Sequence, residues 1–138
     1  MNLRLDWDAI RAGGVVSLVF AVPFSVAARW AADNGDRGLA TGLVLVAIIG
    51  FLVGGGCAAW VQRVDAPLTH GVVTAGGTYL LAQAVFVTVR LVRGMDVQWF
   101  AIVFNLTAAT FAGLLGGLLG QRLRSRGFVP SSRSRPQQ

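Results

Sequence analysis

Side chains that could carry chemistry are few in this sequence, and they are widely separated. The chain has one histidine (His70), one cysteine (Cys57) and six aspartates, with no glutamate and no lysine. Acid–base and nucleophilic catalysis need two or three such groups in contact, and a metal ion needs three or four ligands. No spacing in the sequence brings such a set onto one helix face or into one loop. We therefore expect no enzymatic activity, no catalytic residue, no cofactor and no metal site.

The run Gly54-Gly55-Gly56 is the segment closest in composition to a phosphate-binding loop. In such a loop a Lys and then a Ser or Thr follow the glycines and bind the phosphates and a magnesium ion. Here Cys57 and Ala58 follow instead, within a long apolar segment. We expect these glycines to lie inside a helix. The Cys57 thiol has no second cysteine to pair with, and we expect it to be buried and inert.

His70 is the only side chain expected to titrate near neutral pH. It stands beside Gly71 at the start of the third apolar segment of the chain. A single histidine makes no metal site, and its position at the end of an apolar segment predicts a solvated residue at the membrane interface.

The segments that must position these residues are strongly apolar. Hydrophobic residues make up 54% of the 138 residues and charged residues 13%, whereas a soluble domain carries about 25% charged residues. All twelve Arg and all six Asp lie outside four windows, which run between Arg11 and Arg29, Arg37 and Arg63, Asp65 and Arg90, and Asp96 and Arg122. The shortest window has 17 residues, and as a helix it would span roughly 26 Å of a hydrocarbon core about 30 Å thick. Each window is therefore long enough to cross a membrane.

The sequence thus predicts an all-α integral membrane bundle of four transmembrane helices, arranged as two hairpins in one domain over residues 1–120. Asp6 or Asp8 would cap the first helix, and Pro67 suits the first turn of the third. Residues 121–138 contain Arg, Ser, Pro and Gln with almost no apolar side chains, which predicts a disordered basic cytoplasmic tail. The expected helices cover about 10–31, 38–61, 68–92 and 98–120.

The first apolar segment also has some features of a cleaved signal peptide. Its small residues at Ser25 and Ala27 resemble a cleavage site, but Asp6 and Asp8 are unusual in such a leader. We therefore expect this segment to be retained as a transmembrane helix.

The distribution of arginines predicts the orientation. Eight Arg lie in the N-terminus, the second loop and the tail, and four lie in the first and third loops. The positive-inside rule then places both termini in the cytoplasm, with the protein as a multi-pass component of the cell membrane. Five of the eight lie in the last 18 residues, so the basic surplus is a tail and not a folded surface for nucleic acid. The tail would either bind anionic lipid headgroups or act only as a topology determinant; the headgroup contacts would come from Arg122, Arg124 and Arg126.

Small residues recur at every fourth position in the second and fourth helices. In a lipid environment such stripes let helix backbones approach closely, and close packing replaces the hydrophobic effect as the main source of helix association. The stripes therefore predict packing faces, either inside the bundle or against a second copy or a foreign subunit. The expected packing residues are Gly42, Gly50, Gly54, Gly113, Gly116, Gly117 and Gly120.

Apart from His70 near the start of the third window, the polar side chains in the windows are uncharged at neutral pH. Gln83 and Asn105 are the costliest of them in a membrane, and we expect them to hydrogen-bond across helices. No acidic or basic residue that could couple transport to an ion lies at membrane depth. An alternative function is a small channel or carrier in which several protomers enclose a path lined by Thr74, Thr78, Gln83 and Asn105.

The stretch Gly54-Gly55-Gly56-Cys57-Ala58-Ala59, with Pro67, His70-Gly71 and Gly76 after it, resembles a family of small bacterial four-helix membrane proteins. Members share a Gly-Gly-x-x-Ala stretch in the second helix and an x-His-Gly or Gly-rich entry to the third. The likeness covers about the middle third of the chain. It implies the four-helix architecture, and it supplies no catalytic residues because the family has no assigned activity.

Together these observations predict a non-enzymatic membrane protein that acts by helix packing. It would do so as a homo-oligomer or as an accessory subunit of a larger membrane assembly. Its expected partners are the lipid bilayer and either itself or another membrane protein, with no nucleic acid.

Overall fold

The computed structural model describes residues 5–128 and 130. This part of the chain forms four helices: α1 (Trp7–Asp33), α2 (Arg37–Val61), α3 (Pro67–Val92) and α4 (Trp99–Ser125). Each helix is long and apolar enough to cross a membrane, and no strand occurs among the described residues. The prediction of an all-α bundle of four transmembrane helices is confirmed, and the chain is a multi-pass membrane protein.

Two helices begin directly after aspartates whose carboxylates accept hydrogen bonds from backbone N–H groups. The Asp6 carboxylate accepts a bond from the Ala9 backbone N–H at 3.2 Å, and the Asp36 carboxylate accepts one from the Leu39 N–H at 2.9 Å. Each bond satisfies one of the backbone donors that have no partner in the first turn of a helix. Of the two predicted caps of α1, Asp6 is therefore the one that forms. Pro67 lies in the first turn of α3, as expected.

The helix bounds agree with the predicted ones to within three residues, except at the end of α4. The predicted helix ends at residue 120, whereas α4 continues to Ser125. The prediction that disorder begins at residue 121 was therefore wrong. The rest of the predicted tail, residues 129 and 131–138, lies outside the described residues.

Gly127 explains where α4 ends. Its φ is 81°, in the left-handed region that favours glycine. The Gly127 N–H donates to the Arg124 carbonyl at 3.0 Å and the Phe128 N–H donates to the Leu123 carbonyl at 3.2 Å. This is a Schellman cap, which satisfies the last carbonyls of a helix. The composition of the tail suggested disorder, but the glycine that stops the helix comes seven residues later than Gly120.

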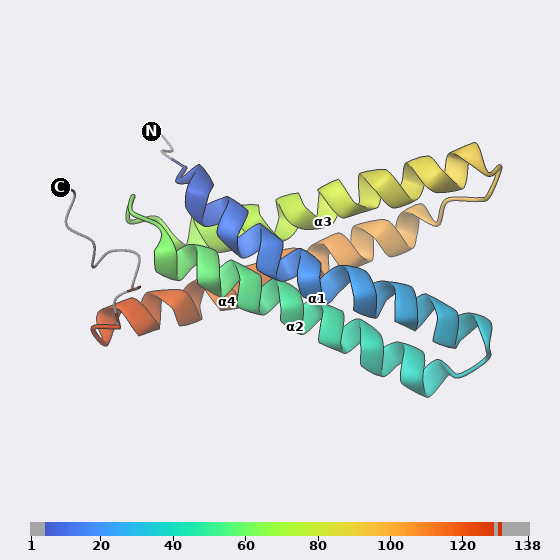
Figure 1. The fold of residues 1–138 in the computed structure, drawn as a ribbon, viewed down its shortest axis with the longest axis horizontal. Coiled ribbons are helices and arrows are strands. Elements are labelled where there is room, and N and C mark those ends of the chain that lie inside the picture. The colour runs from blue at the N-terminus through green and yellow to red at the C-terminus, as the bar shows by residue number, and fades with distance from the viewer. Residues whose placement is uncertain (1–4, 129, 131–138) are drawn as a thin grey trace.

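The two hairpins cross and then diverge (Figure 1). At one end the start of α1, the loop between α2 and α3 and the end of α4 lie together; we call this the junction end. At the other end, the open end, the turn between α1 and α2 lies far from the turn between α3 and α4. Helix α1 contacts α2 and α3, and α4 contacts the same two helices. Within the described residues no Cα atom of α1 lies within 8 Å of a Cα atom of α4.

Burial follows this shape along α3 and α4. The last buried residue of α3 is Tyr79, and the first buried residue of α4 is Ala109. The aromatic rings of Phe51 on α2 and Tyr79 on α3 meet edge to face, with centroids 6.1 Å apart. Around them packs a small apolar cluster drawn from all four helices, whose buried members are Ala21, Phe51, Ala75, Tyr79, Ala109 and Ala112.

Seven residues beyond this contact, toward the open end, the facing sides of α2 and α3 are no longer packed together. Residues seven apart lie on the same side of a helix, so Val44 continues the face of Phe51 and Phe86 continues the face of Tyr79. Val44 is 39% exposed and Phe86 is 40% exposed, whereas the two aromatic rings that meet are almost fully buried. The hairpins are thus joined over about half their length, and their apolar faces are uncovered toward the open end.

Candidate functional site

Glycines bring the four helices together at the junction end. A Cβ placed on Gly120 of α4 would lie 2.6 Å from the Gly56 carbonyl oxygen of α2, and one on Gly113 would lie 2.5 Å from the Ala75 Cβ of α3. Contacts of this length leave no room for a side chain. The backbones of α2, α3 and α4 therefore approach each other as closely as two helices can, which is the packing that small residues permit in a membrane.

The predicted packing residues divide into two groups. Six of them lie against another helix of the same chain: Gly50 and Gly54 face α1, Gly116 and Gly120 face α2, and Gly113 and Gly117 face α3. Gly42 does not, because a Cβ at this position would have nothing within 4 Å. Gly42 precedes the point on α2 at which the helices meet, and it is exposed.

Two further glycines, which the periodicity of small residues did not select, are packed as closely against another helix. A Cβ on Gly71 of α3 would meet the Gly113 carbonyl and lie 3.0 Å from Gly117 Cα, and one on Gly13 of α1 would meet the Gly54 carbonyl. Neither belongs to a long small-residue stripe. In the sequence, each of these glycines stands beside another small or polar residue near the start of its helix, in Gly13-Gly14 and His70-Gly71. These pairs could have identified the two glycines as packing residues.

Two threonines proposed to line a path lie in this packed region. Thr74 is fully buried and Thr78 is 8% exposed. A Cβ on Gly14 of α1 would lie 3.1 Å from the Thr78 hydroxyl, and one on Gly13 would lie 3.0 Å from the Thr74 methyl. These side chains face α1 inside one protomer. The expectation that Thr74 and Thr78 line a path between protomers was therefore wrong, because the contacts of α1 cover them.

Two buried hydroxyls in this region, Ser17 Oγ and Thr74 Oγ1, have no hydrogen-bond partner among the described residues. Ser17 Oγ lies directly against the place where a Gly54 Cβ would stand. Both side chains are fully buried.

Gln83 and Asn105 meet at a third polar side chain, that of Tyr79. The Gln83 amide donates to the Tyr79 hydroxyl at 2.9 Å, within α3, and the Tyr79 hydroxyl donates to the Ile102 carbonyl of α4 at 3.0 Å. The Asn105 side chain of α4 lies near this hydroxyl. The expected link between helices is present, but it runs through Tyr79, which sequence reasoning counted only as one polar residue among many.

We predict that Tyr79→Phe lowers the free energy of unfolding by about 1 kcal/mol, because it leaves the Gln83 amide and the Ile102 carbonyl without this partner. The measurement is reversible unfolding in mixed micelles with increasing dodecyl sulfate. Thr107→Val is the matched control, since the exposed Thr107 hydroxyl bonds only to Val103 of its own helix at 3.0 Å. Equal stability losses in the two variants would contradict the assigned role of Tyr79.

His70 is fully buried; the expectation of a solvated residue was therefore wrong. Its Nε2 accepts a hydrogen bond from the Asp6 backbone N–H at 2.9 Å, and its Nδ1 lies 2.7 Å from the Ala66 carbonyl oxygen. Because Nε2 is the acceptor, the proton of the neutral ring must be on Nδ1, which donates to Ala66. Asp6, which makes this contact with the ring, is 64 positions away in the sequence.

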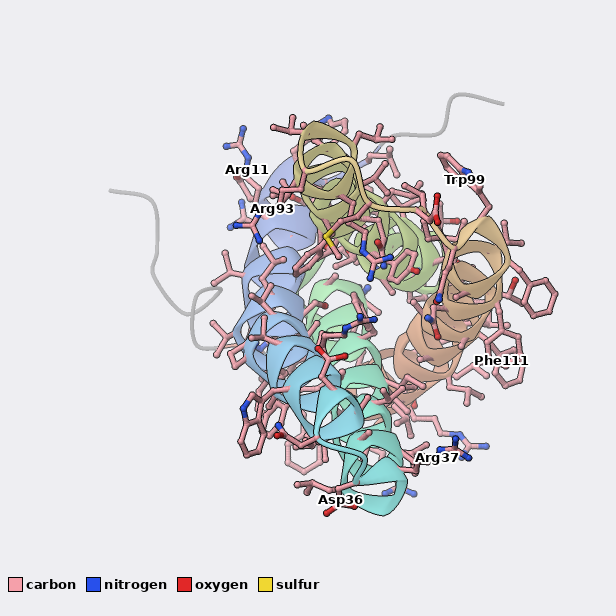
Figure 2. The ribbon with its side chains drawn as sticks, turned by 90° about the vertical axis from the view of Figure 1, so that its right-hand side faces the viewer. Arg11, Asp36, Arg37, Arg93, Trp99 and Phe111 are labelled. Carbon is pink, nitrogen blue, oxygen red and sulfur yellow. The ribbon has the colours of Figure 1, made fainter. Side chains whose placement is uncertain are left out.

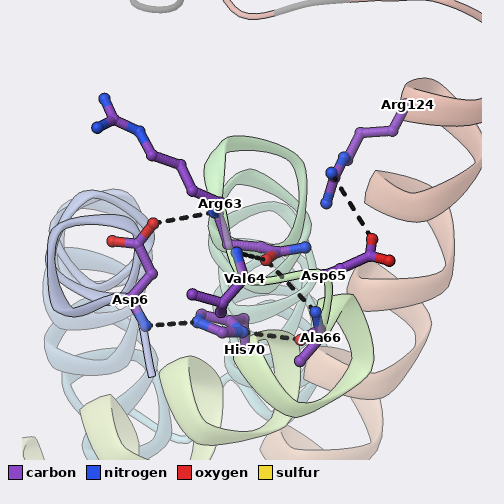
Figure 3. Close-up of polar contacts among 8 residues, drawn as sticks. Asp6, Arg63, Val64, Asp65, Ala66, His70 and Arg124 are labelled. Carbon is purple, nitrogen blue, oxygen red and sulfur yellow. Dashed lines mark hydrogen bonds and ion pairs between the residues drawn. The ribbon is translucent and has the colours of Figure 1, made fainter. Parts of the chain in front are cut away.

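The loop between α2 and α3 closes the same network (Figure 3). The second carboxylate oxygen of Asp6 accepts a bond from the Arg63 N–H at 3.0 Å. The buried Gln62 side chain accepts bonds from the Val64 N–H at 2.8 Å and the Ala66 N–H at 3.4 Å. Asp6 thus ties the start of α1 both to the loop and to α3, and Gln62 holds the loop in shape.

The tail arginines differ from one another. Arg122 and Arg126 are exposed, whereas Arg124 is only 25% exposed and lies 3.8 Å from the Asp65 carboxylate of the loop. Arg124 and Asp65 border a surface pocket of about 370 Å³ whose other lining residues are Pro67, Gln121 and Ser125. Of the three predicted headgroup ligands, two are free to reach the membrane surface and one is engaged with the loop.

No catalytic constellation is assembled at these positions. Among residues 5–128 and 130, no three His, Cys, Asp or Glu side chains gather where they could hold a metal ion. Cys57 is half-buried on α2 and forms no disulfide. Comparison of the chain with protein-family models, with curated proteins and with solved structures finds no match.

Proposed function

We propose that this membrane protein has no enzymatic activity and acts by helix packing, as an accessory subunit that holds a transmembrane helix of another protein between its hairpins. The observation that carries the proposal is the divergence of the hairpins beyond Phe51 and Tyr79. There Val44 and Phe86 continue the two faces that are packed together at Phe51 and Tyr79, yet these side chains are 39% and 40% exposed. Two hairpins that are packed together at one end and diverge at the other present apolar faces between which an apolar helix can pack.

A foreign helix is favoured over a second copy by the way in which the chain uses its small residues. Stripes of glycine would be the natural surface for self-association in a membrane. Here most of the stripe on α2 and α4 faces other helices of the same chain, and Gly42 is the exception. The half-buried amides of Gln83 and Asn105 lie near the Tyr79 hydroxyl, beside the Phe51–Tyr79 contact. They offer polar groups to an incoming helix.

We further propose that the junction end faces the cytoplasm and that the protein resides in the cell membrane. The support is the excess of arginine at the termini and the α2–α3 loop. In this orientation the exposed Arg122 and Arg126 stand where anionic lipid headgroups lie, and Arg124 joins them if its ion pair with Asp65 opens. The open end then lies in the outer half of the bilayer.

Photo-crosslinking tests the proposed partner site. We predict that a photoreactive residue at Phe86 forms an adduct with one defined polypeptide in native membranes, because the partner helix contacts this face. The matched control is the same residue at Phe111, which is 60% exposed and points away from the bundle (Figure 2). The adduct should match the partner found by mass spectrometry of the gently extracted native complex, and Phe86→Ala should weaken that complex while Phe111→Ala leaves it intact.

Three outcomes would count against the accessory-subunit proposal. An adduct of two 14.5 kDa chains would identify a homo-oligomer. Adducts with lipid alone at both positions would mean that the diverging faces are simply lipid-exposed. Equal protein adducts at Phe86 and Phe111 would show contact without a specific site.

A further inference from the structure

The buried imidazole of His70 joins three separate parts of the chain at the junction end. Asp6 precedes α1, Ala66 ends the α2–α3 loop, and His70 itself lies in the first turn of α3. Both ring nitrogens are occupied, one as acceptor and one as donor. Such an arrangement requires a neutral ring, because an imidazolium has two N–H donors and no acceptor.

We propose that the contact between Asp6 and His70 is a proton-sensitive latch, which releases the start of α1 from the α2–α3 loop when the ring takes up a proton. The proton comes from solvent and binds Nε2. The new Nε2–H then points at the Asp6 N–H, two donors face each other at a separation of 2.9 Å, and the existing hydrogen bond is lost.

The nearest anion that can accept the new N–H is the carboxylate of Asp6 itself. In the neutral state its two oxygens are used by the Ala9 N–H at 3.2 Å and the Arg63 N–H at 3.0 Å. If the carboxylate turns to the imidazolium, it leaves both of these donors. Protonation therefore exchanges three hydrogen bonds of Asp6 for one ion pair, removes the cap of α1 and frees the loop.

The other charged groups near the ring do not compensate this change. From the loop, the Arg63 side chain points away from His70, and Asp65 points toward α4 (Figure 3). From α4, Arg124 pairs with Asp65 at 3.8 Å. The end of α2 contributes the uncharged Gln62, and the exposed Asp8 and Arg11 belong to the first two turns of α1. Among the described residues, Asp6 is thus the one acidic residue that hydrogen-bonds the ring, and it does so through its backbone nitrogen.

Solution measurements on the full chain in lipid nanodiscs test the latch. His70 is the only histidine, so a protein made without a histidine tag gives one unambiguous set of ring ¹⁵N signals. The signals of the neutral ring should place its proton on Nδ1, and a titration toward lower pH follows the formation of the imidazolium. Hydrogen exchange of the Ala9 and Arg63 amides, corrected for its intrinsic pH dependence, should become about tenfold faster as the ring protonates.

The chain contains its own control for this experiment. Leu39 is capped by Asp36 at 2.9 Å in the same way as Ala9 is capped by Asp6, but at the open end, far from His70. Its exchange should not change over this pH range. In His70→Gln an amide can still accept from Asp6 and donate to Ala66 but does not titrate, so the exchange of Ala9 and Arg63 should be independent of pH.

Several results would overturn the latch. One is a ring proton on Nε2 at about pH 8. Another is ring protonation without any change at Ala9 and Arg63 relative to Leu39. A third is the same pH-dependent exchange in His70→Gln as in the wild type, which would assign the effect to another group.

Discussion

Gly116→Ala should lower the free energy of unfolding by about 1 to 3 kcal/mol, the usual range for overpacking a well-packed site. The added methyl would meet the Leu52 carbonyl oxygen of α2 and lie 2.8 Å from the Gly56 nitrogen. Both obstacles are backbone atoms, so no side-chain rotation can relieve the clash, and α4 must move away from α2. Unfolding in mixed micelles with dodecyl sulfate measures the effect.

Gly77→Ala is the control for this substitution, and its expected effect has the opposite sign. A Cβ on Gly77 has nothing within 4 Å, and alanine is a better helix former than glycine by about 1 kcal/mol. The variant should be as stable as the wild type or slightly more stable. If Gly116→Ala and Gly77→Ala changed stability equally, the close contact of α2 and α4 would be wrong.

His70→Ala should be the second strongly destabilising substitution, with a loss of roughly 2 to 4 kcal/mol. It removes the largest of the fully buried side chains, leaves a cavity, and deprives the Asp6 N–H of its acceptor. Near pH 8 we expect His70→Gln to recover most of this loss, because the amide fills much of the volume and can make both hydrogen bonds.

Comparison of these two variants distinguishes a packed His70 side chain from a solvated one. Thermal or detergent-induced unfolding of both, measured against the wild type at one pH, is sufficient. A solvated surface histidine would give changes within about 0.5 kcal/mol for either substitution. Such a result would contradict the burial of the His70 ring.

The number and type of the helices could be predicted from charge placement alone. An unpaired charge in hydrocarbon is costly, so the gaps between Arg and Asp mark the spans with little ambiguity. The cap by Asp6 and the role of Pro67 were also predictable, because both depend on atoms within one turn of the residue. The late end of α4 was missed because Gly127 sits inside a stretch whose composition suggests disorder.

The packing faces could be predicted only in part. Gly42 and Gly50 belong to the same stripe on α2, yet Gly50 lies against Phe20 of α1 and Gly42 contacts nothing. What distinguishes them is the point at which the hairpins cross, and this depends on all four helices together. A periodicity in one helix identifies a possible face, but it does not reveal how much of that face another helix covers.

The polar contacts were hardest to predict because they join distant residues. The burial of His70 depends on Asp6, 64 residues earlier. The hydrogen bond between α3 and α4 is accepted by the backbone carbonyl of Ile102. Every residue has such a carbonyl, so the sequence does not indicate which one accepts a bond from another helix. Tyr79 provides the link because its hydroxyl both accepts and donates, whereas the amides of Gln83 and Asn105 were the more conspicuous groups.

The packing of α4 on α2 and α3 has a consequence for the order of assembly during biosynthesis. When the first three helices have entered the membrane, the side of α2 that carries Gly55 and Gly56 still has no α4 against it, since these glycines meet Gly113 and Gly116. Helices α2 and α3 provide the surface on which α4 packs. A ribosome stalled before α4 would therefore hold a nascent chain with a ready surface for its own last helix, open to any competing helix nearby.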